Sequence, residues 1–168
     1  VLDPPTPTGA AAADLLGRTT RALIGGQFED LDFERRESVT VAECLAMAAG
    51  KTGALVSCSA AVGAVLAGAP ADTIAALEAY GERVGLAFQL EDDLLGIWGD
   101  PAVTGKPALA DLRARKKSLP VAAALATGGP AAARLRDWLA TPAPPPDHTV
   151  DDLAELFDTN LGLEDADE

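Results

Sequence analysis

One predicted helix carries a face of polar side chains within an otherwise apolar stretch. In the segment GLAFQLEDDLLGIWGD, Asp92, Asp93 and Gly96 follow Gln89 by three, four and seven residues. These spacings place all four residues on one face of an α-helix. Neighbouring carboxylates repel each other and cost desolvation unless a cation or water compensates them. The face therefore indicates either a solvated acidic surface or a site for a hard cation.

Two other segments hold side chains that could complete such a site. Lys51 and Thr52 stand in the middle of an apolar helical stretch, GKTGAL. The Asp-rich helix ends in a glycine-containing loop that leads to five basic residues and a single acid: Lys106, Arg113, Arg115, Lys116 and Lys117, with Asp111. Carboxylates hold Mg²⁺, and lysines and a glutamine bind anionic oxygens. Together these are the parts of a magnesium–diphosphate site.

The elements expected to position these residues are helices. Apolar spacing predicts a first helix over residues 10–33. The capping box TVAE, which begins at Thr40, starts a second helix that runs through the GKT segment to Ala67. Gly50 and Gly53 are expected to bend this helix.

The Asp-rich segment belongs to a third long helix, and shorter elements follow it. The expected order is a helix over 72–98, an ordered loop GDPAVTGKPALAD, short helices after Pro120 and Pro130, a Pro-rich loop over 141–148, and a terminal helix with an acidic tail over 149–168. Alanine is abundant and only 4% of the residues are aromatic. We therefore expect a single all-α domain over 1–168, built as a helical bundle.

Charge narrows the classes of partner. The formal net charge is −13, and the segment from Asp151 to Glu168 contains eight acids and no base. So acidic a chain is not expected to bind nucleic acid. A small polyanion bound at the local basic segment is compatible with the charge distribution.

The cysteines and the apolar segments indicate a cytoplasmic protein. Cys44 and Cys58 form no CxxC pair and lie in apolar surroundings, which predicts buried free thiols in a reducing compartment. Residues 52–71 are uncharged but rich in Ala, Gly and Ser, and Pro70 closes the segment. We expect a buried bundle helix there and no stable membrane span.

Four segments, in this order, resemble a known family. GGQFEDLDFE, KTGAL, FQLEDDLLG and GKPALADLRARKKSLP are similar to the GQ-x-x-D helix, the KT element, the second aspartate-rich motif and the GK…D…K-x-T/S-L-P stretch of the trans-polyprenyl diphosphate synthases. This is the family of farnesyl and geranylgeranyl diphosphate synthases, and the resemblance covers its C-terminal half. It implies an isoprenoid-synthase-type helical bundle that is incomplete here, a homodimer, and Mg²⁺ as cofactor.

The resemblance also implies roles for individual residues. Asp92 and Asp93 would hold Mg²⁺, with Asp92 as the direct ligand. The groups that would bind an allylic diphosphate are Lys51, Gln89, Lys106 and Lys116. Thr52 would lie near the reacting carbon, and Gln27 and Asp30 would support the pocket. Ionisation of the allylic diphosphate, attack by the double bond of isopentenyl diphosphate and loss of a proton would give a longer polyprenyl diphosphate.

The sequence departs from the family pattern in two respects. The motif DD-x-x-D has Gly96 at its third position, and the nearest later acid in the sequence is Asp100. In the family pattern, the first aspartate-rich motif and the Lys and Arg groups for isopentenyl diphosphate belong upstream of Val1. The segment DDLAE at 151–155 imitates an aspartate-rich motif, but its acids fit the first turn of a helix. We expect the chain of 168 residues alone to be inactive.

Two alternatives to the enzyme stay open at this point. A non-catalytic helical subunit that modulates a prenyl synthase partner fits Gly96 and the lack of a first aspartate-rich motif. A class I terpene cyclase shares the fold and the metal chemistry, but the GK and KKSLP segments argue against it.

Overall fold

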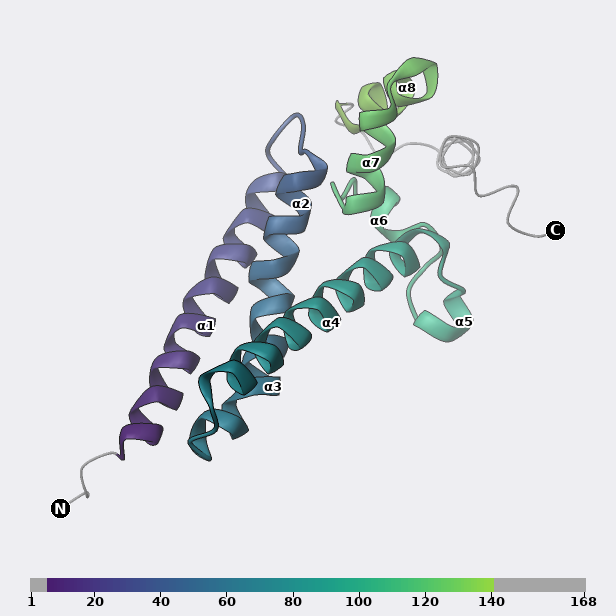
Figure 1. Cartoon of the computed structure of the whole chain (residues 1–168). Coiled ribbons are helices and arrows are strands. Elements are labelled where there is room, and N and C mark those ends of the chain that lie inside the picture. The colour runs from purple at the N-terminus through teal and green to yellow at the C-terminus, as the bar shows by residue number, and fades with distance from the viewer. Residues whose placement is uncertain (1–5, 141–168) are drawn as a thin grey trace. The chain divides into compact units, whose positions relative to one another are not determined.

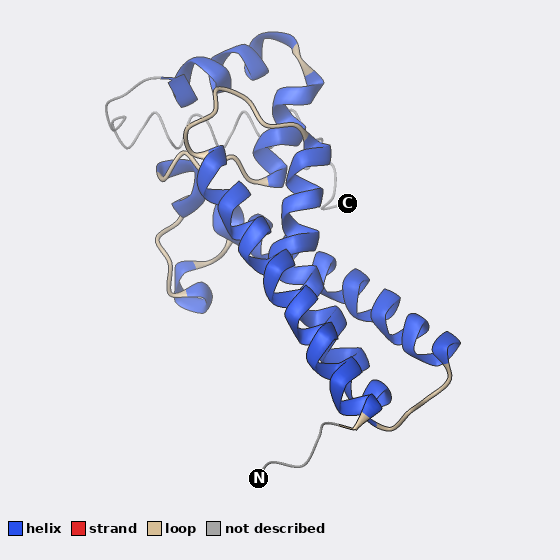
Figure 2. Cartoon of the chain, turned by 90° about the vertical axis from the view of Figure 1, so that its left-hand side faces the viewer, coloured by secondary structure: helices blue, strands red, loops and turns tan. Residues whose placement is uncertain are grey.

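The computed structural model describes residues 6–140. Helices and loops make up all of this range, without a strand (Figures 1 and 2). The elements are α1 (Pro7–Phe33), α2 (Val41–Ala48), the π-helical turn η1 (Ala49–Gly53), α3 (Ala54–Leu66), α4 (Ala71–Trp98), α5 (Pro101–Thr104), α6 (Ala110–Arg113), α7 (Leu119–Thr127) and α8 (Gly129–Ala140). The all-α prediction is confirmed for this range. The Pro-rich loop and the terminal helix predicted over 141–168 lie outside the described residues.

Helix starts follow the capping chemistry of the sequence. The backbone N–H of Glu43 donates to Thr40 Oγ1 at 3.2 Å, while Glu43 Oε2 accepts from the backbone N–H of Thr40 at 2.8 Å. The predicted capping box is therefore confirmed. Helix α1 begins earlier than predicted, at Pro7, because Thr6 Oγ1 accepts from the N–H of Gly9 and proline suits the first turn.

Helices α2 and α3 form one continuous run interrupted by η1. The π turn lies where the sequence places Gly50 and Gly53, and the N–H of Ala54 donates to the carbonyl of Ala49. The pair Lys51–Thr52 is thus carried on a widened turn. Such turns occur often at functional sites.

The helices group into two compact units. One comprises, among the described residues, 6–31 together with Leu45–Gln89. Its core joins Leu15 of α1, Cys58 and Ala61 of α3, and partly buried residues of α4 such as Ile74. Close helix contacts depend on glycine, since a Cβ on Gly85 of α4 would lie 2.8 Å from the Cα of Gly53.

The other unit comprises, among the described residues, Asp32–Cys44 and residues 90–140. Its core contains residues of α4, α6, α7 and α8 that are all less than a tenth exposed: Ile97, Leu112, Val121, Ala124, Leu135 and Trp138. Cys44 is also buried here, and neither Cys44 nor Cys58 forms a disulfide, as predicted. The prediction of one domain over 1–168 extends beyond the described residues and stays a prediction.

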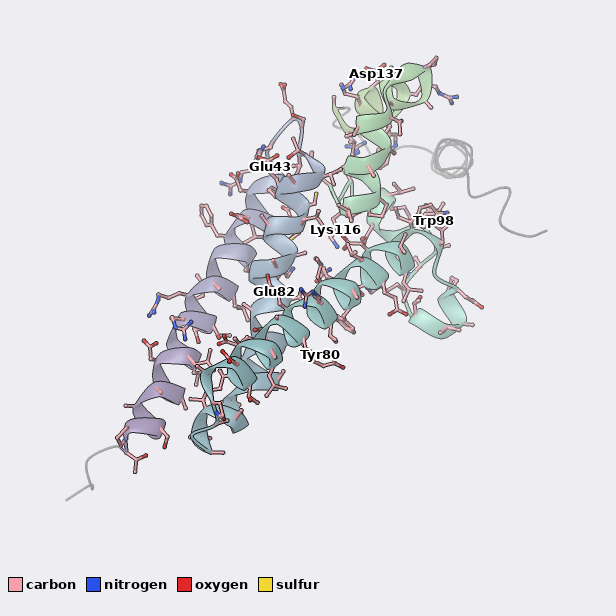
Figure 3. The ribbon with its side chains drawn as sticks, viewed as in Figure 1. Glu43, Tyr80, Glu82, Trp98, Lys116 and Asp137 are labelled. Atoms are coloured by element: carbon pink, nitrogen blue, oxygen red, sulfur yellow. The ribbon has the colours of Figure 1, made fainter. Side chains whose placement is uncertain are left out.

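Helix α4 packs with a different face from the one the sequence suggested. The sequence analysis allowed a solvated acidic surface on the polar face of this helix. Instead Gln89 and Asp93 are buried, whereas Phe88 is 62% exposed and Tyr80, which Figure 3 labels, is 64% exposed. Small residues on the polar face explain the difference, because Gly81, Gly85 and Gly96 let neighbouring chain segments approach closely there.

One helical run has the length and apolar composition of a membrane span. It extends from Val41 to Leu66, with a mean hydropathy of 1.4 in its most apolar window. Lys51 lies near its middle and is ion-paired to Asp30 of α1.

Candidate functional site

The first group of predicted site residues lies in the unit that holds most of α1. Lys51 Nζ lies 2.6 Å from Asp30 Oδ2, and both side chains are mostly buried, at 31% and 20% exposure. Lys51 stands in an apolar stretch of the sequence, and its acidic partner comes from α1. Asp30 thus supports Lys51 directly. Gln27 is half-buried on α1, and no hydrogen bond among the described residues joins it to this pair.

Thr52 and Gln89 make the second contact of this group. The Thr52 hydroxyl donates to Gln89 Oε1 at 2.6 Å, which orients the buried amide. The π turn that carries Lys51 and Thr52 packs tightly on α1, because a Cβ on Gly26 would lie 2.9 Å from both the Cα of Lys51 and the carbonyl carbon of Gly50. Glycine at position 26 is therefore what allows α1 to reach this backbone.

The second group lies in the other unit and begins at Asp92. Asp92 Oδ1 lies 3.4 Å from Lys106 Nζ, and the two side chains are 44% and 50% exposed. Lys106 follows Gly105, whose φ of 67° ends α5 in the left-handed region. An ion pair this long and exposed contributes little to the stability of the fold. Both groups can therefore bind a ligand instead of each other with little loss of stability.

Asp93 is buried and fully engaged. Its Oδ1 accepts from Lys116 Nζ at 3.2 Å, and its Oδ2 accepts from the backbone N–H of Leu119 at 3.2 Å. Figure 3 labels Lys116, which lies between two carboxylates, because its Nζ is also 3.2 Å from Asp111 Oδ2. Burial lowers the pKa of Lys116, but Asp93 and Asp111 outweigh it and hold the pKa above its ordinary value. Lys116 is therefore a cation.

Asp111 is the residue that the sequence analysis counted but did not place in the site. It stands against Gly96, where the family pattern has its third acid: a Cβ on Gly96 would lie 2.5 Å from Asp111 Cγ. Asp100, the nearer acid in sequence, accepts from the N–H of Ala102 and caps α5 instead. Only the fold of α6 reveals this neighbour, since positions 96 and 111 lie far apart along the chain.

The donor chemistry of the second group fits Mg²⁺ with Asp92 as ligand. No group of three or more His, Cys, Asp or Glu side chains could hold a metal within residues 6–140. Mg²⁺ does not need such a cage, because it keeps several waters and is commonly bound by one or two carboxylates plus substrate phosphates. Asp92 offers an exposed carboxylate of this kind, whereas both oxygens of Asp93 already accept hydrogen bonds.

Helix α4 connects the two groups along the chain. It carries Gln89 in one unit and Asp92 and Asp93 in the other. The first group holds Asp30, Lys51 and Thr52 with Gln89, and the second holds Lys106, Asp111 and Lys116 with the two aspartates. Every residue proposed for catalysis or diphosphate binding thus belongs to one of these two polar clusters.

Comparison with known proteins identifies relatives of this arrangement. A family model described as polyprenyl synthetase matches residues 6–157. A (2E,6E)-farnesyl diphosphate synthase of Mycobacterium tuberculosis is 55% identical over 139 residues, which cover 83% of this chain and 39% of the relative. A geranylgeranyl diphosphate synthase of the same organism is 55% identical over 121 residues, which cover 72% of this chain and 35% of the relative.

Solved structures give the same result. The crystal structure of a polyprenyl synthetase from Streptomyces coelicolor is matched with a TM-score of 0.87 and 47% identity over 95% of this chain and 49% of that one. A geranylgeranyl pyrophosphate synthase from Corynebacterium glutamicum, complexed with isoprenyl diphosphate and magnesium, is matched with a TM-score of 0.82 and 32% identity, over 94% of this chain and 45% of that one. The chain spans about two fifths of the length of the curated relatives and about half of the solved structures.

Proposed function

The chain belongs to the polyprenyl synthetase family, and from this premise we propose that it forms the part of a prenyltransferase that binds and ionises an allylic diphosphate. The whole protein would condense this substrate with isopentenyl diphosphate to a longer polyprenyl diphosphate. The observation that carries the proposal is the half-exposed Asp92 carboxylate beside the half-exposed Lys106 ammonium, an acid for a metal next to a cation for an anion.

The second group supplies the charged end of the proposed site. Asp92 would be the direct Mg²⁺ ligand, and Asp93 would contribute through its negative charge and through the groups that it holds. Lys106 and Lys116 would bind oxygens of the diphosphate. Mg²⁺, when bound, would neutralise negative charge on the departing diphosphate.

The first group supplies the residues proposed to lie nearer the reacting carbon. Lys51, held by Asp30, would bind a diphosphate oxygen, and Gln89, oriented by Thr52, would bind another. The Thr52 oxygen would stabilise positive charge that develops on the allylic carbon. Groups that are already fixed in this way lose little conformational entropy when the substrate binds.

In the proposed reaction, the C–O bond of the allylic diphosphate breaks first, and the diphosphate leaves with the electron pair. The double bond of isopentenyl diphosphate attacks the allylic cation, and a C–C bond forms. The resulting cation loses a proton from the adjacent carbon to the released diphosphate or to water, and the electrons of that C–H bond form the new double bond. Lysines around the diphosphate lower the barrier to the first step, because they stabilise the charge that appears on the leaving group.

The test uses the full-length protein that contains this sequence. It is incubated with Mg²⁺, an allylic diphosphate and labelled isopentenyl diphosphate, and the products are separated by chain length. We expect label in longer prenyl diphosphates. A folded protein that binds the allylic diphosphate with Mg²⁺ but gives no such product would favour the alternative, a non-catalytic subunit that modulates a prenyl synthase.

Three properties accompany this proposal. The Lys51–Asp30 pair near the middle of the run from Val41 to Leu66 argues for a bundle helix, because charged groups are costly within a bilayer. A homodimer stays a prediction from the resemblance, and a cytoplasmic location stays a prediction from the two buried thiols.

A further inference from the structure

Gly96 leaves room on α4 for a carboxylate that comes from another element. Position 96 follows Asp93 by one helical turn on the buried face of α4. A Cβ added there would lie 2.5 Å from Asp111 Cγ and 2.9 Å from Asp111 Oδ1. The carboxylate of Asp111 thus occupies the space in which a side chain at position 96 would begin.

The backbone around α6 fixes Asp111 in this place. Leu112, the next residue, is fully buried and belongs to the same core cluster as Ile97, the neighbour of Gly96. Helix α6 ends in a Schellman turn, in which the N–H of Lys116 donates to the carbonyl of Asp111 and Arg115 adopts a φ of 54°. This turn reverses the chain direction, so that the side chain of Lys116 lies next to that of Asp111.

The turn brings the Lys116 ammonium between two carboxylates. It donates to Asp93 Oδ1 and to Asp111 Oδ2, each at 3.2 Å. An ammonium has three N–H donors, so one donor is left after these two bonds. The Lys116 side chain is 30% exposed and can therefore be reached by a ligand.

We propose that Asp111 is a positioning residue of the proposed diphosphate site, in which its carboxylate fills the space beside Gly96 and fixes the Lys116 ammonium for an oxygen of the diphosphate. This inference rests on the proposed function. It explains Gly96 by space and not by backbone freedom, because the residue is helical. A lysine held by two carboxylates has already lost the side-chain entropy that a free lysine loses on binding.

A positioning role and a purely electrostatic role predict opposite changes in diphosphate affinity when the Asp111 carboxylate is removed. If net charge alone decided affinity, removal of the Asp111 carboxylate would tighten the binding of an anion. If Asp111 acts by holding Lys116, its removal weakens binding. The measurement is calorimetric titration of the full-length protein with inorganic diphosphate in Mg²⁺ buffer, with thermal unfolding of each variant recorded by circular dichroism.

The variants form a cycle. Asp111→Ala and Gly96→Ala should each weaken diphosphate binding by roughly tenfold or more, the second because the new methyl group displaces the Asp111 carboxylate. In the Asp111→Ala background, Gly96→Ala should have no further effect and Gly96→Asp should recover part of the affinity. Gly63→Ala, a helical glycine with no neighbour within 4 Å of an added Cβ, is the matched control and should leave the affinity unchanged.

Each outcome has a defined reading. Unchanged or tighter binding in Asp111→Ala, or an equal loss from Gly96→Ala with and without Asp111, would overturn this inference. Asp111→Asn, which keeps the volume, replaces Asp111→Ala if that variant unfolds. A wild-type protein that binds no diphosphate with Mg²⁺ would contradict the proposed function itself. If the wild type binds diphosphate and Asp111→Ala binds it equally well, only the role of Asp111 is contradicted.

Discussion

Individual side chains in the two clusters differ in how firmly they are held. Lys106 and Asp92 form a long, exposed pair, whereas Lys116 and Asp93 are joined by one shorter contact and are mostly buried. Breaking a buried pair leaves an uncompensated charge and is strongly destabilising, but an exposed pair contributes less than about 1 kcal/mol. Substitution of Lys106 therefore separates ligand binding from folding more cleanly than substitution of Lys116.

Lys106→Ala should weaken the binding of inorganic diphosphate by roughly tenfold, the loss of one charge-assisted hydrogen bond. The unfolding temperature should stay within about one degree of wild type, since the pair with Asp92 is exposed. Arg83→Ala is the control, because it removes one exposed positive charge elsewhere on α4. Equal losses of affinity in the two variants would mean that overall charge, and not a contact of Lys106, governs binding.

Glu43 provides a test by pH. Hydrogen bonds from the Thr40 backbone and hydroxyl, together with Arg36, lower the pKa of Glu43 from 4.5 to about 2. Its contribution to stability is therefore complete above pH 4.5 and is lost as the pH falls through about 2. Glu43→Gln keeps an acceptor for the cap and removes the charge. It should unfold at a lower temperature than wild type at neutral pH.

The difference between Glu43→Gln and wild type should shrink below pH 4.5 and be gone near pH 2, when the unfolding temperature is measured across this range. Glu29→Gln, an exposed residue of α1, serves as the reference for the loss of a surface carboxylate. A difference that does not change between neutral and acid pH would show that the Glu43 charge has no part in the cap.

The residue types and their order along the chain were enough to predict the polar face of α4 and both lysine segments. The partners were not predictable, because pairing depends on how helices lie beside one another. Asp30 and Lys51 stand on different helical segments, and so do Gly96 and Asp111. Only tertiary structure turns such separations into contacts.

At the scale of elements, glycine determines how closely the helices approach. Capping residues, prolines and apolar spacing in the sequence predicted the order of the longer helices within 6–140. They did not predict the short helices α5 and α6, because the segment GDPAVTGKPALAD was expected to be an ordered loop. They did not reveal which face of α4 is buried, because large apolar residues outweigh glycines in any periodicity argument. Tight backbone contact at Gly81 and Gly85 favours the polar face instead.

Adjacent glycines of α1 allow a matched test of this principle. A Cβ on Gly25 would meet nothing within 4 Å, whereas a Cβ on Gly26 would meet the backbone of Gly50 and Lys51. Gly25→Ala should stabilise the protein by about 0.5–1 kcal/mol through helix propensity. Gly26→Ala should destabilise it by about 1–3 kcal/mol through overpacking against the π turn.

Chemical denaturation measures both free energies of unfolding. Gly26→Ala should also weaken diphosphate binding, because it displaces the backbone that carries Lys51. Stabilisation by both substitutions would contradict the close contact between α1 and η1.

At the scale of the whole molecule, large apolar side chains remain exposed on long helices. On α4 these are Tyr80, Val84, Phe88, Leu94 and Leu95, and on α1 they are Leu16, Ile24, Phe28 and Leu31. Extended apolar surface of this kind promotes association. The chain also spans only about two fifths of the length of its curated relatives.

The chain of 168 residues, purified alone, should therefore associate or aggregate, and it should not elongate an allylic diphosphate with isopentenyl diphosphate and Mg²⁺. Sedimentation velocity measures the first property and product chromatography the second. Clear elongation by a monomeric preparation of this chain would show that it contains all the groups that the reaction needs.

The measurement that tests the central claim most directly is calorimetric titration of the full-length protein with inorganic diphosphate, with and without Mg²⁺, for wild type, Asp92→Ala and Glu91→Ala. Glu91 is an exposed acid next to Asp92 on α4 and supplies the control. We predict that binding requires Mg²⁺, is lost in Asp92→Ala and persists in Glu91→Ala while all three proteins stay helical. Equal binding by wild type and Asp92→Ala, or binding independent of Mg²⁺, would contradict the assignment of α4 as the metal–diphosphate face.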